Sequence, residues 1–134
     1  MTINFLRLNH VQICIPVGKE QEAREFYCDF LGLEEIEKPD ILKKNGGFWL
    51  MVADIELHVG TEQVENHSKR HPAFEVEQLE EIREMMTARG LKLRESPDLP
   101  GFRRFSFYDP FNNRIELLEK IGDQNQMSLS DQES

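Results

Sequence analysis

The stretch IELHVG at residues 55–60 decides the fold, because its first three letters return sixty positions later in IELLEK at residues 115–120. A three-residue match is weak by itself. The flanking landmarks repeat as well: His10 precedes His71 by 61 positions, and Gly32 precedes Gly90 by 58. A repeat at a nearly fixed period indicates two copies of one structural unit.

Each half of the chain shows the same order of hydrophobic patterns. Alternating apolar residues predict strands at 8–17, 33–38, 47–53 and 54–60, and the i, i+3, i+4 spacing predicts a helix at 20–33 that ends near Gly32. In the second half the strands are expected at 71–76, 91–96, 102–109 and 113–119, with a helix at 78–91. The fold class is therefore predicted as α+β, with two tandem β-α-β-β-β modules whose sheets form a curved surface that encloses a cleft.

The composition suits one globular domain. The chain has 134 residues, 39% hydrophobic and 31% charged, and a net charge of −9 that argues against a nucleic-acid or anionic-membrane surface. No apolar run approaches the ~20 residues of a membrane span. Cys14 and Cys28 are interpreted as free thiols, which suggests the cytoplasm. We expect a domain at 1–121, with module one at about 5–60 and module two at about 70–120, a linker at 61–70 that places His67 in solvent, and a flexible polar tail at 122–134.

Strand alternation sorts the polar side chains by face. The apolar residues of each strand are expected to pack against the helices, for example Leu57 and Val59 in the strand at 54–60. The opposite, concave face then receives imidazoles and carboxylates from separate strands: His10, Glu56, His58, His71 and Glu116.

Two histidines with one or two carboxylates are typical ligands of a divalent cation that keeps positions open for substrate. His10 and Glu56 are 46 positions apart, and His71 and Glu116 are 45 apart. Each module would thus supply one histidine and one carboxylate to a site for Zn, Ni, Co or Mn.

Other residues carry weaker expectations. Arg104 shares a face with Ser106 and Tyr108 and is interpreted as a surface arginine, with contact to a substrate anion as the alternative. Trp49 and Met51 are expected in the core. Nothing around Cys14 indicates an activated thiolate.

The motifs LNHVQICIP, EAREFYCDFLGL, IELHVG and PGFRRFSFYDPFNNRIELLE together resemble the vicinal oxygen chelate superfamily, which contains glyoxalases, bleomycin-resistance proteins and extradiol dioxygenases. The resemblance covers about residues 5–119 and is specific for the superfamily, not for one activity. Asn112 stands where the closing signature usually has glycine, and asparagine tolerates the left-handed conformation that this turn needs.

The resemblance implies a metal at His10, His71 and Glu116, with Glu56 as a fourth ligand in glyoxalase I-like members. It also implies that Glu116 acts as the base, with Glu56 as its partner. His58 is an additional residue on the same face as Glu56, and could be a ligand, a general base or a substrate contact.

The function expected from these observations is that of a metal-dependent lyase or isomerase acting on a small molecule with neighbouring oxygens. The metal would be Zn, Ni, Mn, Co or Fe. Three alternatives stay open: a metal-free, ligand-sequestering protein of the bleomycin-resistance type, an extradiol dioxygenase, and a thiol transferase that modifies an antibiotic. The expected partners are a small-molecule substrate and a second copy of the chain in a homodimer, with no nucleic acid and no membrane.

Overall fold

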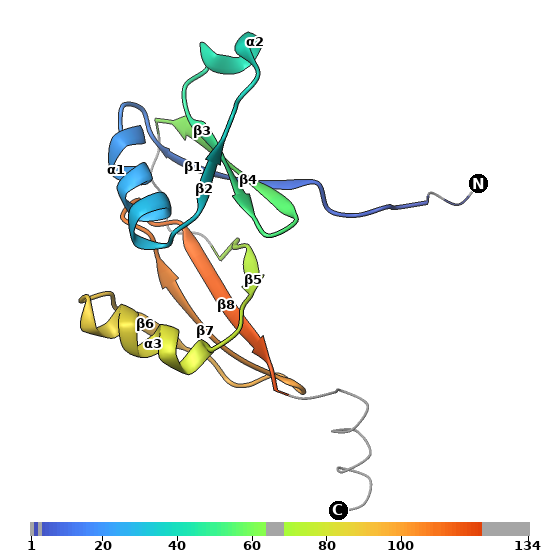
Figure 1. Cartoon of the computed structure of the whole chain (residues 1–134), viewed down its shortest axis with the longest axis vertical. Coiled ribbons are helices and arrows are strands. Elements are labelled where there is room, and N and C mark those ends of the chain that lie inside the picture. The colour runs from blue at the N-terminus through green and yellow to red at the C-terminus, as the bar shows by residue number, and fades with distance from the viewer. Residues whose placement is uncertain (1, 3, 64–68, 122–134) are drawn as a thin grey trace, which may run out of the picture. The chain divides into compact units, whose positions relative to one another are not determined.

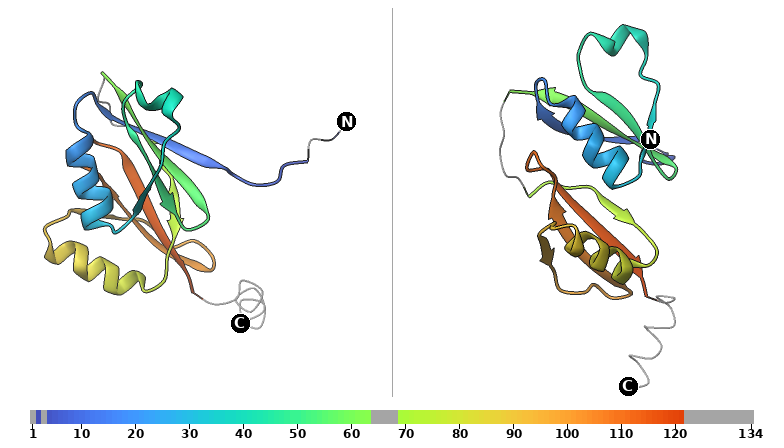
Figure 2. Two further views of the ribbon diagram at one scale, coloured as in Figure 1. Left: turned by 45° about the horizontal axis from the view of Figure 1, so that its top comes forward. Right: turned by 60° about the vertical axis from the view of Figure 1, so that its left-hand side comes forward.

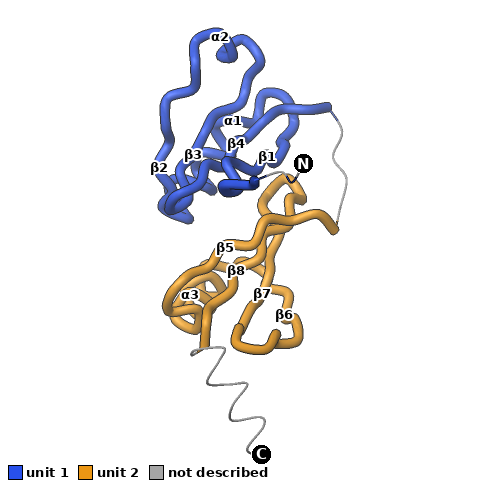
Figure 3. Tube along the Cα trace, turned by 90° about the vertical axis from the view of Figure 1, so that its right-hand side faces the viewer, with its two compact units in different colours: residues 1–66 blue, residues 67–134 orange. Residues whose placement is uncertain are grey.

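The computed structural model describes residues 2, 4–63 and 69–121, so His67 and the tail at 122–134 lie outside the described part. The chain divides into two compact units, residues 1–66 and 67–134 (Figure 3). Each unit is a four-stranded mixed sheet with a helix between its first two strands (Figure 1).

Unit 1 has the predicted β-α-β-β-β order with one added helix. Its elements are β1 (His10–Pro16), α1 (Glu20–Arg24), η1 (Glu25–Phe30), β2 (Glu34–Ile36), α2 (Asp40–Lys43), β3 (Phe48–Val52) and β4 (Ile55–Glu62). The strands are arranged β1-β4-β3-β2, with β1 parallel to β4 and the other pairs antiparallel.

Unit 2 repeats this topology. Its elements are β5 (Ala73–Glu75), α3 (Leu79–Ala88), β6 (Leu93–Glu95), β7 (Phe102–Tyr108) and β8 (Arg114–Lys120). The order β5-β8-β7-β6 and the parallel β5–β8 pair match unit 1. The predicted α+β class and repeated module are therefore confirmed.

The core of each unit lies between the helix and one face of the sheet (Figure 2). In unit 1, Leu57 and Val59 are each 1% exposed, as the alternation predicted. In unit 2, Phe105 and Phe107 are fully buried, and the Arg83 guanidinium lies over the Phe105 ring at 4.9 Å. Burial of these apolar faces is the main stabilising contribution.

Two local features differ from the prediction. The first helix changes from α to π geometry over Glu25–Phe30, and the Leu31 amide donates to the Phe26 carbonyl five residues earlier. Helix α2 forms where a loop was expected; Asp40 in its first turn and Lys43 in its last complement the helix dipole. Gly32 ends the first helix with φ 80°, as expected.

Strand β5 is shorter than the predicted strand at 71–76. Pro72 has no N–H to donate, so the ladder begins at Ala73 and His71 precedes it. The two parallel pairs therefore differ in register: His10 pairs with Glu56, whereas Ala73 pairs with Glu116. The histidine–carboxylate relation is not the same in the two units, contrary to what the similar spacings suggested.

Within the described part of the chain, no helix is both long and apolar enough to cross a lipid bilayer. Cys14 and Cys28 are not joined in a disulfide, as predicted.

Candidate functional site

Three aromatic rings form a stack on the polar face of the unit 1 sheet. Trp49 and His58 are register partners on β3 and β4, and their rings are 3.8 Å apart and almost parallel. The His10 ring covers the other side of His58 at 4.0 Å. His58 is consequently only 7% exposed although it lies opposite the apolar face.

Glu56, the predicted carboxylate ligand in unit 1, contacts the central ring of this stack. His58 Nε2 lies 3.0 Å from Glu56 Oε1, within hydrogen-bond distance. Imidazole lone pairs lie in the ring plane, so the nearly parallel rings of His10 and His58 do not aim their nitrogens at one common point. Glu56 and His58, the two candidates for a fourth ligand, thus engage each other.

His10 has one nitrogen already occupied. Its Nδ1 lies 2.9 Å from Asn9 Oδ1, an oxygen that only accepts hydrogen bonds. In the neutral ring Nδ1 therefore carries the proton, and the Nε2 lone pair remains for another partner.

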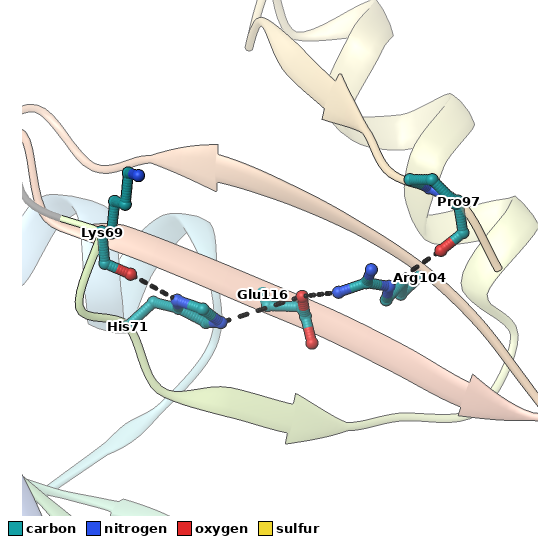
Figure 4. Close-up of polar contacts among 5 residues, drawn as sticks. All are labelled: Lys69, His71, Pro97, Arg104 and Glu116. Carbon is teal, nitrogen blue, oxygen red and sulfur yellow. Dashed lines mark hydrogen bonds and ion pairs between the residues drawn. The ribbon is translucent and has the colours of Figure 1, made fainter. Parts of the chain in front are cut away.

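His71 in unit 2 is held in the same way. Its Nδ1 lies 2.8 Å from the Lys69 carbonyl oxygen, which again leaves the lone pair on Nε2 (Figure 4). That Nε2 faces Glu116 Oε1 at 3.9 Å, beyond hydrogen-bond distance. The Glu116 side chain is 6% exposed, so its carboxylate is withdrawn from bulk water.

Arg104 neutralises Glu116. Its guanidinium donates to Glu116 Oε1 at 2.9 Å and to the Pro97 carbonyl at 3.0 Å (Figure 4). The interpretation of Arg104 as a surface residue is therefore wrong: β7 and β8 place it as a same-face neighbour of Glu116. Ser106, the register partner of Glu116, is fully buried, and its Oγ has no hydrogen-bond partner among the described residues.

A cavity of about 490 Å³ lies in unit 1 beside the aromatic stack. Its lining consists of His10, Gln12, Lys38, Leu42, Asn45, Gly46, Trp49, His58, Val59, Gly60 and Thr61. The expectation that Trp49 fills the core is wrong, because its neighbours Phe48 and Leu50 occupy the buried face of β3 and Trp49 faces the cavity.

Sequence reasoning missed the part of this lining that comes from the connection between β2 and β3. Lys38, Leu42 and Asn45 lie in and around α2, where no periodic pattern marks a face. The signal in the sequence that could have indicated this wall is Gly47. Its φ is 80°, and a Cβ added at this position would collide with the Val59 carbonyl, so the connection runs close against β4.

The cysteine thiols are not activated. Burial, followed by the charge of Glu62, raises the pKa of Cys14. Burial, followed by the charges of Glu35 and Asp29, raises that of Cys28.

Across residues 2, 4–63 and 69–121, no three His, Cys, Asp or Glu side chains gather as ligands of one metal ion. The predicted ligands His10 and Glu56 belong to unit 1, and His71 and Glu116 belong to unit 2. Their meeting around one cation stays a prediction.

Comparison with known proteins gives a consistent family. The model of the Glyoxalase/Bleomycin resistance protein/Dioxygenase superfamily matches residues 7–117. A glyoxalase family protein of Bacillus anthracis is 42% identical, with a TM-score of 0.83 over 90% of this chain and 99% of that one. A search of curated proteins gave no match.

More distant structures share the fold. The fosfomycin resistance protein FosX of Listeria monocytogenes is 20% identical with a TM-score of 0.70, over 90% of this chain and 98% of its own. A glyoxalase/dioxygenase of Nostoc punctiforme is 19% identical with a TM-score of 0.71, over 90% of this chain and all of its own. With the family match covering most of its length, the chain belongs to the Glyoxalase/Bleomycin resistance protein/Dioxygenase superfamily.

Proposed function

We propose that the protein is a metal-dependent enzyme of the lyase or isomerase type that acts on a small molecule with neighbouring oxygens. His10, His71 and Glu116 would hold the cation. Membership of the superfamily supports this, and one of the FosX structures that share the fold contains Mn(II). Two imidazoles with a carboxylate suit Zn, Mn, Fe, Ni or Co.

The observation that carries the proposal is the state of the two histidines. In both, Nδ1 lies within hydrogen-bond distance of an oxygen acceptor, so the lone pair of the neutral ring is on Nε2. A hydrogen bond from the second ring nitrogen to a carbonyl or amide oxygen is the usual support of a metal-binding histidine.

The distance between His71 and Glu116 supports the same reading. Donor atoms that each bind one cation at about 2.1 Å are separated by roughly 3.0–3.5 Å. His71 Nε2 and Glu116 Oε1 are 3.9 Å apart, which is too long for a hydrogen bond and close to this separation. Glu116 Oε1 also accepts from Arg104, so the cation and the guanidinium would compete for this oxygen.

The two carboxylates receive different roles in this proposal. A bound cation would supply Lewis-acid polarisation of the two substrate oxygens. Glu116 is assigned to ligation and not to the role of base that the resemblance implies, because Arg104 already donates to the Oε1 that would take the proton. Glu56 is assigned to proton transfer or to the fourth ligand position, and His58 orients it through the 3.0 Å contact.

The test is elemental analysis of purified protein with single and double alanine variants of His10 and His71. About one divalent ion per chain is expected in the wild type, with strong loss in His10→Ala, His71→Ala. His67→Ala, which removes a histidine outside the predicted site, is the matched control and should keep the metal. Equal metal content in the wild type and in a folded double variant would contradict the proposal.

A second candidate function is metal-free sequestration of a small ligand. The unit 1 cavity and the stack of Trp49, His58 and His10 favour it, because they offer a small ligand a pocket with an aromatic wall. Absence of metal together with a higher melting temperature in the presence of small aromatic ligands would favour this candidate. Extradiol cleavage and thiol transfer have no specific observation in their favour, and the homodimer stays a prediction.

A further inference from the structure

The cavity of unit 1 has an unusual charge for this protein. Its lining contains one permanently charged side chain, Lys38, and no aspartate or glutamate. The chain as a whole carries a net charge of −9. A cation in a cavity without acidic lining favours an anionic ligand and disfavours a cationic one.

Lys38 is positioned to bind an anion. Its ammonium donates to the Gly46 carbonyl, which holds the side chain at the cavity. An ammonium has three donors, so two remain. Among the described residues no carboxylate lies within ion-pair distance of Lys38, whereas Lys43 in the same connection contacts both Glu37 and Asp40.

The remaining walls suit a small organic molecule. Trp49 and Leu42 supply apolar surface, and Gln12, Asn45 and Thr61 supply neutral polar groups. The volume of about 490 Å³ falls within the range of small-molecule sites, roughly 300–1,000 Å³.

We propose that this cavity binds a small aromatic carboxylate, with Lys38 as the anion contact and Trp49 as the packing surface. This inference rests on the proposed function and names its substrate class. His10, a proposed metal ligand, belongs to the same lining, so the cavity adjoins the proposed metal site. Lys38 determines specificity, because loss of its charge removes the preference for an anion over its neutral isostere.

The test uses the fluorescence of Trp49, which is the single tryptophan of the chain. Benzoate and its neutral analogue benzamide are titrated into EDTA-treated and metal-loaded protein. Benzoate should change the fluorescence saturably and bind the wild type more tightly than benzamide does. Lys38→Met should weaken benzoate binding about tenfold, as expected for a lost charge-assisted hydrogen bond, and leave benzamide binding unchanged.

Lys44→Met is the matched control, because it removes the same charge from an exposed residue of the same connection. Lys38→Arg should retain the preference for benzoate. Equal affinities for benzoate and benzamide in the wild type would overturn the proposal, as would unchanged benzoate binding in Lys38→Met. The wild-type comparison decides the matter even if the variants fail to fold.

The two proposals fail separately. Preferential benzoate binding in a protein that holds no metal would keep the cavity assignment and remove the metal-dependent function. A protein that holds metal but binds benzoate no more tightly than benzamide would keep the metal-dependent function and remove the cavity assignment.

Discussion

Arg104 and a metal ion should compete for Glu116, and their competition can be measured as stability. Arg104→Met removes the guanidinium 2.9 Å from Glu116 Oε1 and leaves a carboxylate whose side chain is 6% exposed. Breaking a buried pair costs about 3–5 kcal/mol, and the partial exposure of Arg104 (21%) places this case at the lower end. The expected loss in the free energy of unfolding is therefore about 3 kcal/mol without metal.

A divalent cation should reverse much of this loss. At a free concentration one hundred times its dissociation constant, a ligand that binds only the folded state adds about 2.7 kcal/mol. Urea denaturation in EDTA and in MnCl₂ measures both quantities. Because removal of a positive charge beside Glu116 favours binding of a cation, Mn²⁺ should stabilise Arg104→Met more than it stabilises the wild type.

Arg103→Met is the matched control, since Arg103 is exposed and its loss should change stability by less than about 0.5 kcal/mol. Equal stabilisation of Arg104→Met and the wild type by Mn²⁺ would refute the assignment of Glu116 as a ligand. A loss below about 1 kcal/mol in EDTA would refute the buried ion pair itself.

Two further predictions concern the β7–β8 turn and the thiols. Asn112 has φ 70°, a left-handed conformation that alanine adopts at a cost and glycine adopts freely. In urea denaturation, Asn112→Ala should lower the free energy of unfolding by about 1 kcal/mol, and Asn112→Gly should change it little. Equal effects of the two variants would contradict a strained position. Burial raises the pKa of both Cys14 and Cys28, so the reactive thiolate is scarce at pH 7. Alkylation by iodoacetamide, followed by mass spectrometry, should be slow at pH 7 and faster as the pH rises above 9. Rapid alkylation at pH 7 would indicate an activated thiolate.

The strand order could be predicted because a half-buried strand leaves a period of two in the sequence. Leu57 and Val59 are buried as that alternation indicates, and Glu56 and His58 contact each other on the opposite face. The π-helical turn and α2 could not be read in this way, since neither produces a distinct periodicity. The shortening of β5 follows from Pro72, a signal that was present in the sequence and was not used.

The partners of the site residues were harder to predict, because they depend on register. Arg104 reaches Glu116 since it lies two residues from Ser106, which pairs with Glu116, and diagonal neighbours on one face can contact each other. A shift of one residue in the β7–β8 pair would have turned Arg104 to the other face. Sequence alternation assigned both residues to one side, but only the register brings a guanidinium and a carboxylate together.

The duplicated strands therefore carry matched carboxylates in unlike surroundings. Glu56 on β4 contacts an imidazole that is stacked between Trp49 and His10. Glu116 on β8 contacts the Arg104 guanidinium. A chemical step that needs one acid to hold a cation and another to carry a proton requires such a difference. Duplication places the two acids at equivalent positions, and their contacts make them unequal: His58 two places along β4 for Glu56, and Arg104 on the neighbouring strand β7 for Glu116.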